Sequence, residues 1–459
     1  MNALFAPALR PTLIALACAA SCLLALPAAA RCIDEDRNAP LPETPGGAVE
    51  ASSSTQSPRD QVLELIKRAR ERSKALGAAR LLTEAAAYDV EETRASGKPQ
   101  ASLNLTSGYQ GSGNDATPDA AASNINGSQT RASVNVSAPL FDFGRLGWLT
   151  QWRAAQAEAT RLNQISAEEQ VALQVVSLSA ERSRYRMQSQ VYRQYATKMS
   201  CLVDALGEIT KADKGRASEL IQARKTLAQA ELAYEQSQTL LRQMETRLRR
   251  YVGDPLPPGS SMATLLGALP LIDKVHSDIE RSAVMAGMDA QAEAADSYAK
   301  SVAAGQKPQL GWNAAGSKAV GLGGNPRNWS LGLSLNVPVF NPGADAQLSS
   351  ARKRAEAARL QKLDSLDARK AQAAEVLEQG NAAMDRAQRT VNVLRDSESV
   401  RNVTLQQWQQ LGKRSLFDVM SAEGEHYNLR VSYVNALHDA LQSNALLRSI
   451  AGTLDLDLR

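Results

Sequence analysis

Two long stretches of this chain, residues 140–254 and 343–459, contain no proline. A proline inside a helix costs roughly 3 kcal/mol, so each stretch is free to form long helices. Alanine and leucine supply most of the 44% hydrophobic residues, which also favours helix. We predict helices over 145–211 and 345–411, each about 100 Å long at about 1.5 Å per residue. A compact globular domain does not need rods of that length.

A seven-residue repeat runs along the helix expected over residues 217–251. This spacing is typical of a coiled-coil seam, where one side of a helix packs against a neighbour. The corresponding helix near the carboxyl end, residues 416–452, repeats less regularly. The two registers of the first helix contain Leu220, Leu227, Tyr234, Leu241 and Leu248, and Ala223, Ala230, Ser237, Met244 and Tyr251.

The sequence is internally duplicated. The Lys-Pro-Gln of residues 98–100 recurs at 307–309, and the Pro-Leu-Phe-x-x-Gly of residues 139–144 recurs in degenerate form at 338–343. Because several matches occur in the same order at an offset of about 200 residues, the chain is predicted to contain two copies of one unit. Three further matches join 157–162 with 355–360, 215–218 with 412–415, and 251–253 with 450–452.

Short segments between the helices alternate apolar and polar residues, which predicts strands. The clearest alternation gives one apolar face, made of Trp329, Leu331, Leu333 and Leu335. We place four strands, two in each repeat, at about 101–110, 131–139, 309–316 and 328–338. The predicted fold is therefore mainly α with a smaller β portion.

Each repeat is expected to contain the same order of elements. The first repeat, residues 60–253, begins with a helix at about 60–96. The second repeat, residues 273–459, begins with a helix at about 273–304. Residues 254–272 form the linker between them.

The strands have two possible environments. Each is about nine residues long, which suffices for a tilted strand to cross a membrane. Four strands cannot close a barrel, and an open sheet edge in hydrocarbon leaves backbone groups unpaired at several kcal/mol each. If the strands cross a membrane, the chain must therefore oligomerise and turn its apolar faces toward lipid. The alternative is a small antiparallel sheet in a soluble domain, with one face on a core and the other in water.

The amino end has the order of a secretory signal peptide. Arg10 precedes an apolar stretch, residues 12–26, which is followed by Pro27 and three alanines. We expect a signal peptide over residues 1–30 and a flexible leader over 31–59; an uncleaved membrane anchor is the alternative.

Four cysteines bear on processing and folding. After cleavage only Cys32 and Cys201 remain, too few for the disulfide framework of a small secreted protein. Lipid attachment at Cys32 or Cys22 is a minor alternative. Cys201 lies within a predicted helix and is interpreted as a small buried apolar residue.

Several classes of function are excluded by the sequence. The formal net charge is +4, too small and too evenly spread for a nucleic-acid-binding protein. The body of the chain contains no apolar span of about 20 residues, so it is not a helical membrane protein. The histidines His276, His426 and His438 lack metal-ligand spacing and are interpreted as helix-surface residues. No constellation predicts catalysis, a cofactor or a metal.

With these features the chain resembles the TolC family of outer membrane efflux proteins over essentially its whole mature length. The resemblance rests on the duplicated motif at 139–144 and 338–343, the Gly-x-x-Ser of both repeats, and the segment 412–419 followed by Tyr427 and 433–436. It implies a homotrimer in which four strands per protomer complete a 12-stranded outer membrane barrel. The barrel continues into a long periplasmic tunnel of coiled helices.

The resemblance also implies roles for residues at the helix tips. Arg414 and Asp418 match an arginine and an aspartate of the family's periplasmic pore constriction, where a ring of Asp418 carboxylates would favour cations. Ser415 and Asp418 also fit a helix-capping box worth about 1 kcal/mol, and the two roles are compatible. The tip turns, where a periplasmic adaptor would dock, contain Gly215, Ser218, Gly412 and Ser415.

The tip also departs from the family pattern. Ser421 stands where a second ring aspartate is often found, Ile221 where the first repeat has a partner aspartate, and Gln409 where a tyrosine is found. The closing network of the family therefore cannot be transferred whole to this chain.

The function implied is a passive exit duct of a tripartite efflux or type I secretion system. Its partners would be the periplasmic adaptor, an inner-membrane ABC or RND-type transporter and outer membrane lipid, with Trp329, Leu331, Leu333 and Leu335 facing that lipid. A non-conducting trimeric coiled-coil rod or adhesin is the main alternative, because it shares the export signal and the heptads. A periplasmic enzyme is a third, weakened by the lack of a site.

Overall fold

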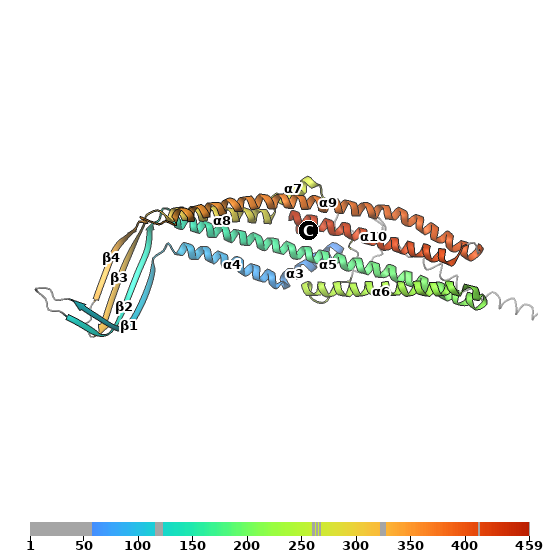
Figure 1. Ribbon diagram of the computed structural model, residues 1–459, viewed down its shortest axis with the longest axis horizontal. Coiled ribbons are helices and arrows are strands. Elements are labelled where there is room, and N and C mark those ends of the chain that lie inside the picture. Colours follow the sequence, from blue (N-terminus) through green and yellow to red (C-terminus); the bar gives the residue numbers. More distant parts are fainter. Residues whose placement is uncertain are drawn as a thin grey trace, which may run out of the picture. The chain divides into compact units, whose positions relative to one another are not determined.

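The computed structural model describes residues 57–114, 123–258, 262, 265, 268–321, 327–411 and 414–458. The expected signal peptide, residues 1–30, lies outside these residues, as do Gly412 and all but the last three residues of the expected leader, 31–59. The described chain is mostly helical and contains one sheet (Figure 1).

The chain folds as two compact units, each made of three segments. Each unit takes residues from both sequence repeats, so this division differs from the duplication. Unit 1 consists of Met1–Arg68, Gln174–Leu269 and Val376–Ala445, and unit 2 of Ala69–Leu173, Pro270–Glu375 and Leu446–Arg459.

The first helical segment of each repeat consists of two helices where the sequence suggested one. In place of a helix over 60–96 the structure has α3, Pro58–Arg72, and α4, Lys74–Ala95; in place of a helix over 273–304 it has α7, Ile272–Arg281, and α8, Ala283–Gly305.

A serine in extended conformation separates the helices of each pair. Ser73 Oγ accepts a hydrogen bond from the amide of Leu76, and Ser282 Oγ accepts one from the amide of Met285. Each serine satisfies a free amide of the new helix, which stabilises a break there by about 1 kcal/mol.

The long helices have the same lengths in both repeats. Helices α5, Arg145–Ala212, and α9, Ala344–Leu411, contain 68 residues each. They are followed by α6, Ala217–Val252, and α10, Leu416–Ala451, of 36 residues each. The short elements are η2, Lys214–Arg216, and α11, Leu454–Leu458.

One of the two heptad registers of α6, and the heptad register of α10, correspond to buried residues. In α6 the buried register is the one that contains mostly small residues, with Ala223, Ala230, Ser237 and Met244. In α10 the residues at the equivalent spacing, Met420, Tyr427, Val434 and Leu441, are buried as well. Small side chains on α6 allow a close approach of the neighbouring helix, while larger ones fill the seam of α10.

All four strands belong to one antiparallel sheet with the order β1-β2-β3-β4 (Figure 1). Strands β1 and β2 extend beyond their predicted bounds of about 101–110 and 131–139, β1 as far as Asn114 and β2 from Ser123. Gly, Asn and Ser residues continue the ladder there because backbone pairing does not depend on side-chain bulk. The strands are β1, Gln100–Asn114, β2, Ser123–Phe141, β3, Gln309–Gly321, and β4, Arg327–Asn336.

The register places apolar residues of all four strands on one face. From β4 to β3, Leu331 lies opposite Ala314 and Leu333 opposite Trp312. Ala314 in turn lies opposite Val136, and Val136 opposite Ala101. The alternate residues form a polar face, which includes Ser102, Asn104, Ser133, Asn135, Ser317, Asn328 and Ser330. The pairing of β2 with β3 makes both faces continuous across the two repeats.

A half-buried carboxyl group, that of Glu169, lies in unit 2, where α5 and the end of α3 meet α11. Burial raises the pKa of Glu169 to about 7, from an ordinary value of 4.5. The Asp455 carboxylate adds to this rise, and Arg70 opposes it. Arg70 itself forms an ion pair with Asp455, at 3.2 Å.

This shift predicts a pH-dependent stability. The pKa of Glu169 is higher in the folded chain than in the unfolded chain. The folding stability that its protonated form contributes is therefore complete below about pH 4.5 and is lost as the pH rises through about 7. Glu169→Gln should therefore raise the melting temperature by a few degrees at pH 8 and leave it unchanged at pH 5. Calorimetry at both pH values tests this, and an equal change at both would contradict it. Glu168→Gln, beside it in the chain, is the control.

Candidate functional site

The first helix tip is a tight turn between α5 and α6. Asp213 Oδ1 accepts a hydrogen bond from the amide of Gly215, at 3.0 Å, and its other oxygen lies 3.7 Å from Arg216 Nε. Gly215 is exposed within η2, and Ser218 is exposed in the first turn of α6. These two residues thus present a solvent-accessible turn.

The second tip begins at α10 and contains a reciprocal helix cap. Ser415 Oγ accepts a hydrogen bond from the amide of Asp418, at 3.3 Å, and Asp418 Oδ2 accepts one from the amide of Ser415, at 3.2 Å. This is the capping box that the sequence suggested. It fixes the Asp418 carboxylate beside the first turn of α10.

Arg414 lies against the same carboxylate. Its Nη1 is 3.8 Å from Asp418 Oδ2, and its Nε donates to Gln407 Oε1 at 3.2 Å. Arg414 and Asp418 are both substantially exposed, so the pair contributes little stability by itself. The structure therefore brings together Arg414, Ser415 and Asp418 at the start of α10.

An apolar cluster lies behind the second tip. Leu416, Val419 and Met420 at the start of α10 are buried against residues of α5, α6 and α9. Ser415, Phe417 and Asp418 lie on the other side of this turn and remain accessible, so the cluster holds the cap in place and leaves its polar groups open to solvent. The other members are Met199, Leu202, Leu206, Ala223 and Leu405.

Buried charges lie one to two turns further along α10. Glu423 is fully buried, with Lys198 Nζ of α5 at 3.9 Å and Arg401 Nη1 of α9 at 3.6 Å. Removing one partner of a buried ion pair typically costs about 3–5 kcal/mol of folding stability, because the remaining charge is then buried without an opposite charge beside it. The three charges thus connect three helices of unit 1.

A second polar layer joins α5 to α10. Arg184 donates to Asn435 Oδ1 at 2.9 Å and to Asp439 Oδ1 at 3.2 Å, and Gln442 donates to Glu181. His438 lies beside them, fully buried, with Nδ1 2.9 Å from the carbonyl of Val434. Burial lowers the pKa of His438, which favours the neutral ring.

The sequence interpretation of the histidines was wrong for two of the three. His426 and His438 are buried, because α10 packs on several sides and leaves little exposed surface. A signal for the buried polar residues does exist in the chain: Glu423, Arg430, Leu437 and Asn444 follow one another at a spacing of seven and are all buried. This register follows the apolar one by three residues and is thus a second seam.

The interpretation of Cys201 was also wrong. Cys201 is disulfide-bonded and only half-buried. The other three cysteines of the sequence lie outside the described residues.

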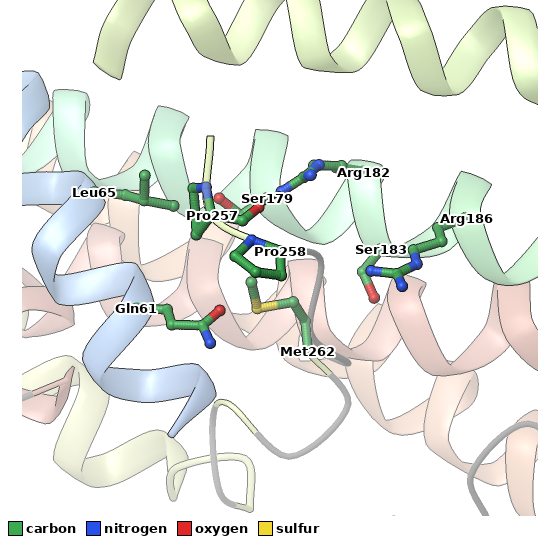
Figure 2. Close-up of a pocket in the computed structure, with 9 residues that line it drawn as sticks. All are labelled: Gln61, Leu65, Ser179, Arg182, Ser183, Arg186, Pro257, Pro258 and Met262. Atoms are coloured by element: carbon green, nitrogen blue, oxygen red, sulfur yellow. Dashed lines mark hydrogen bonds between the residues drawn. The ribbon is translucent and has the colours of Figure 1, made fainter. Parts of the chain in front are cut away.

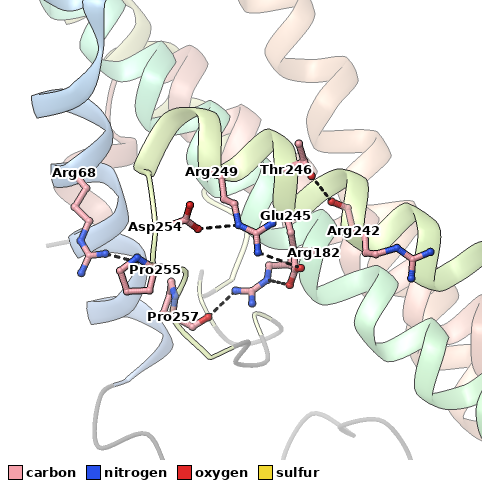
Figure 3. A network of polar contacts seen from close by, with 9 residues as sticks. All are labelled: Arg68, Arg182, Arg242, Glu245, Thr246, Arg249, Asp254, Pro255 and Pro257. Carbon is pink, nitrogen blue, oxygen red and sulfur yellow. Dashed lines mark hydrogen bonds and ion pairs between the residues drawn. The ribbon is translucent and has the colours of Figure 1, made fainter.

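The linker after α6 is held by arginines of unit 1 (Figure 3). Arg182 of α5 donates to the carbonyl of Pro257, at 2.9 Å, and to Glu245 at 3.1 Å. Arg249 donates to Asp254 at 2.9 Å, and Arg68 donates to the carbonyl of Pro255 at 3.3 Å. Residues 254–258 lie outside helix and strand, so these two carbonyls have no regular backbone partner and accept from the arginines instead.

A cavity of about 10 Å³ lies beside this linker (Figure 2). It is lined by Ser179, Ser183 and Arg182 of α5, by Gln61 of α3 and by Pro258, among others. Its volume is sufficient for one water molecule.

The strand residues suggested to face lipid are strongly exposed. Trp329 is 85% exposed, and Leu331, Leu333 and Leu335 are between 66% and 72% exposed. A face of this kind, uncovered in a single chain, needs a partner or an apolar solvent.

Two kinds of feature are absent from the part of the chain that the structure describes. It contains no group of three or more His, Cys, Asp or Glu side chains arranged to hold a metal ion. Among the described residues, no helix combines the length and the apolarity needed to span a bilayer.

Comparisons with known proteins agree with this architecture. Residues 65–254 and 275–453 match the family model described as outer membrane efflux protein. No curated protein sequence matches at a significant level.

Three solved structures of similar fold are distant in sequence. The channel CusC has 17% identity and a TM-score of 0.74, over 86% of this chain and 92% of that one. The Campylobacter jejuni outer membrane channel CmeC has 13% identity and a TM-score of 0.75, over 91% and 94%. The Vibrio cholerae outer membrane protein VceC has 20% identity and a TM-score of 0.69, over 87% and 95%.

These structures support the fold, while the family model covers most of both repeats. The family is a family of efflux ducts and not of enzymes, and it indicates the bacterial outer membrane. The chain thus belongs to the outer membrane efflux protein family.

Proposed function

We propose that this protein is the outer membrane exit duct of a tripartite efflux or type I secretion system, with a long periplasmic extension. It conducts substrates passively, and a separate inner-membrane transporter supplies the energy. The observation that carries the proposal is the two-faced sheet, apolar on one side and polar on the other, on helices of 68 residues.

The sheet supports a membrane barrel of three chains. Among the described residues, the edge strand β1 pairs with β2 and the edge strand β4 pairs with β3, which leaves the outer backbone edge of each without a partner strand. In hydrocarbon these edges must pair, and four strands are too few to do so alone. A homotrimer would join β4 of one protomer to β1 of the next and give a barrel of twelve strands, with the polar face inside.

Exposed apolar side chains on the helices of unit 2 support the same assembly. Leu81, Leu82 and Tyr88 of α4 and Leu360 and Leu363 of α9 are more than half exposed. Residues of this kind on coiled helices normally pack against another helix. In a trimer, neighbouring protomers would cover them.

The tip residues would form the narrow end of the duct. Three copies of the Arg414–Asp418 pair around the threefold axis would constrict it, and the exposed turns containing Gly215, Ser218 and Ser415, with Gly412, would contact a periplasmic adaptor. An ABC or RND-type transporter would lie beyond the adaptor, in the inner membrane.

Conductance in a planar lipid bilayer tests the proposed function. Purified mature protein should give discrete, long-lived current steps, because a closed barrel with a polar interior admits ions. A non-conducting trimeric rod or adhesin, the alternative function, shares the coiled helices but has no need of a polar-lined sheet. A membrane-inserted oligomer without current steps, even when the tip is destabilised, would favour that alternative.

A charge on the apolar face should prevent assembly in the membrane. Leu333→Lys should cost roughly 2–4 kcal/mol near mid-strand and reduce the trimer recovered from outer membranes. Ser334→Lys, the next residue and on the polar face, is the matched control and should assemble. Semi-native electrophoresis of membrane extracts measures the trimer; equal loss from both variants would argue against lipid contact.

The two roles of Asp418 can be separated by two substitutions. Asp418→Asn retains an oxygen that can accept the hydrogen bond of the cap but removes the charge, whereas Asp418→Ala removes both. Both should weaken cation selectivity and block by multivalent cations, while only Asp418→Ala should lose about 1 kcal/mol of stability. Reversal potentials and thermal unfolding measure the two effects, and unchanged selectivity in both variants would leave Asp418 only its capping role.

A further inference from the structure

The four strands carry positive charge and no negative charge. Their described residues include no Asp or Glu, and the only charged side chains are Arg131 of β2, Lys318 of β3 and Arg327 of β4. A sheet that only had to be soluble would gain from mixed charges. The three cations therefore need an explanation of their own.

Two of the three cations are direct neighbours. Lys318 and Arg327 lie opposite each other across β3 and β4, and both side chains are exposed. Like charges directly opposite each other on antiparallel strands repel and destabilise the pair. The ion pairs and hydrogen bonds of the described chain do not involve the side chain of either residue, so nothing described in the protein compensates this repulsion.

The pair lies on the apolar face. Arg327 has the same parity in β4 as Trp329, Leu331 and Leu333, and Lys318 follows Gly316 and Ala314 in β3 on that face. Arg131 has the opposite parity and lies on the polar face with Asn135. The basic pair therefore faces the same surroundings as the exposed apolar residues, and Arg131 does not.

The position of the pair along the strand is also specific. Lys318 lies nine residues beyond Gln309, which begins β3 next to the helices. At about 3.3 Å per residue and a tilt of about 40°, the pair lies roughly 20–25 Å from that end, the height of the apolar band of a membrane barrel. This is the level at which headgroups of the distant leaflet begin.

The duplication supports that level independently. The offset from Lys98 to Lys307 relates Lys318 to Tyr109, and the offset from Pro139 to Pro338 relates Arg327 to Ser128. Tyr109 and Ser128 are themselves partners across β1 and β2, and Tyr109 is 77% exposed. Tyrosine is enriched at membrane–water interfaces, where its ring is apolar and its hydroxyl is hydrated. The first repeat thus has an interface residue where the second has the basic pair.

We infer that Lys318 and Arg327 bind the phosphate of a lipid in the outer leaflet of the membrane. This assignment rests on the proposed function, because it requires the apolar face to contact lipid. Arginine matches phosphate oxygens with two parallel hydrogen bonds, and lysine adds a point charge from the adjacent strand. One phosphate between the two side chains removes their repulsion and supplies the missing negative charge.

The lipid of this class that is confined to the outer leaflet is lipopolysaccharide, a phosphorylated glycolipid, and it is the occupant to which the geometry points. A glycerophospholipid or free phosphate has the same binding chemistry. The site is therefore a contact that orients each protomer at the outer surface of the membrane, three times in a trimer.

The double variant Lys318→Gln/Arg327→Gln tests the assignment. Wild-type protein and variants are purified as trimers, and bound lipopolysaccharide is measured by native mass spectrometry and by the shift in melting temperature on its addition. The double variant should lose at least about tenfold in affinity, the equivalent of one charge-assisted contact. Arg131→Gln is the matched control, with one charge removed from the polar face, and should bind as wild type does.

Further arms separate the sources of phosphate and the causes of failure. Phosphatidylglycerol vesicles and inorganic phosphate should stabilise the wild type much less than lipopolysaccharide does; an equal shift with either would overturn the glycolipid assignment. The exchange Lys318→Arg/Arg327→Lys retains both charges and should retain binding. This variant still tests the site if the neutral double variant misfolds. Unchanged affinity in a neutral double variant that still forms conducting trimers would overturn the site and leave the proposed function intact.

Discussion

The pairing of β2 with β3 joins the two repeats into one sheet, and its register determines what the sheet can do. Because side chains alternate between faces, a shift of one residue would exchange the apolar and polar sets of one repeat relative to the other. In the observed register Val136 lies opposite Ala314 and Asn135 opposite Ala315, so both faces continue from the first hairpin into the second. A continuous apolar face is what a lipid-facing wall requires, and a continuous polar face is what a water-filled interior requires.

The same sheet also leaves a single chain with backbone and apolar groups that it does not cover by itself. Each edge strand has one unpaired side within the chain, and the exposed apolar residues of α4 and α9 add to the surface that one protomer cannot cover alone. The duplication makes the two hairpins similar. The antiparallel pairing that joins the two hairpins within one chain can therefore also join a hairpin of one chain to a hairpin of another. Assembly is thus the natural way for this fold to satisfy its backbone and apolar groups together.

The helices solve a different problem, because long helices must be held in register over many turns. Small residues of α6 allow close packing, while α10 carries a second seam in which Glu423, Arg430 and Asn444 are buried. Buried charges seldom add stability compared with apolar residues of the same size, but they tolerate few alternative alignments. The contacts of Glu423 with Lys198 and Arg401, and of Arg184 with Asn435, therefore act as specific alignment points along the helices of unit 1.

Much of this architecture follows from the sequence by itself. The absence of proline, the heptads and the alternation near Trp329 determine long helices and two-faced strands, because these patterns are local and repeat with the period of the element. The cap formed by Ser415 and Asp418 is local too. Only the tertiary structure decided the burial of His438 and the meeting of Lys318 with Arg327. Those outcomes depend on which segments become neighbours in the fold. A local pattern in the sequence shows that a segment has an apolar face, but it carries no information about which other segment will cover that face.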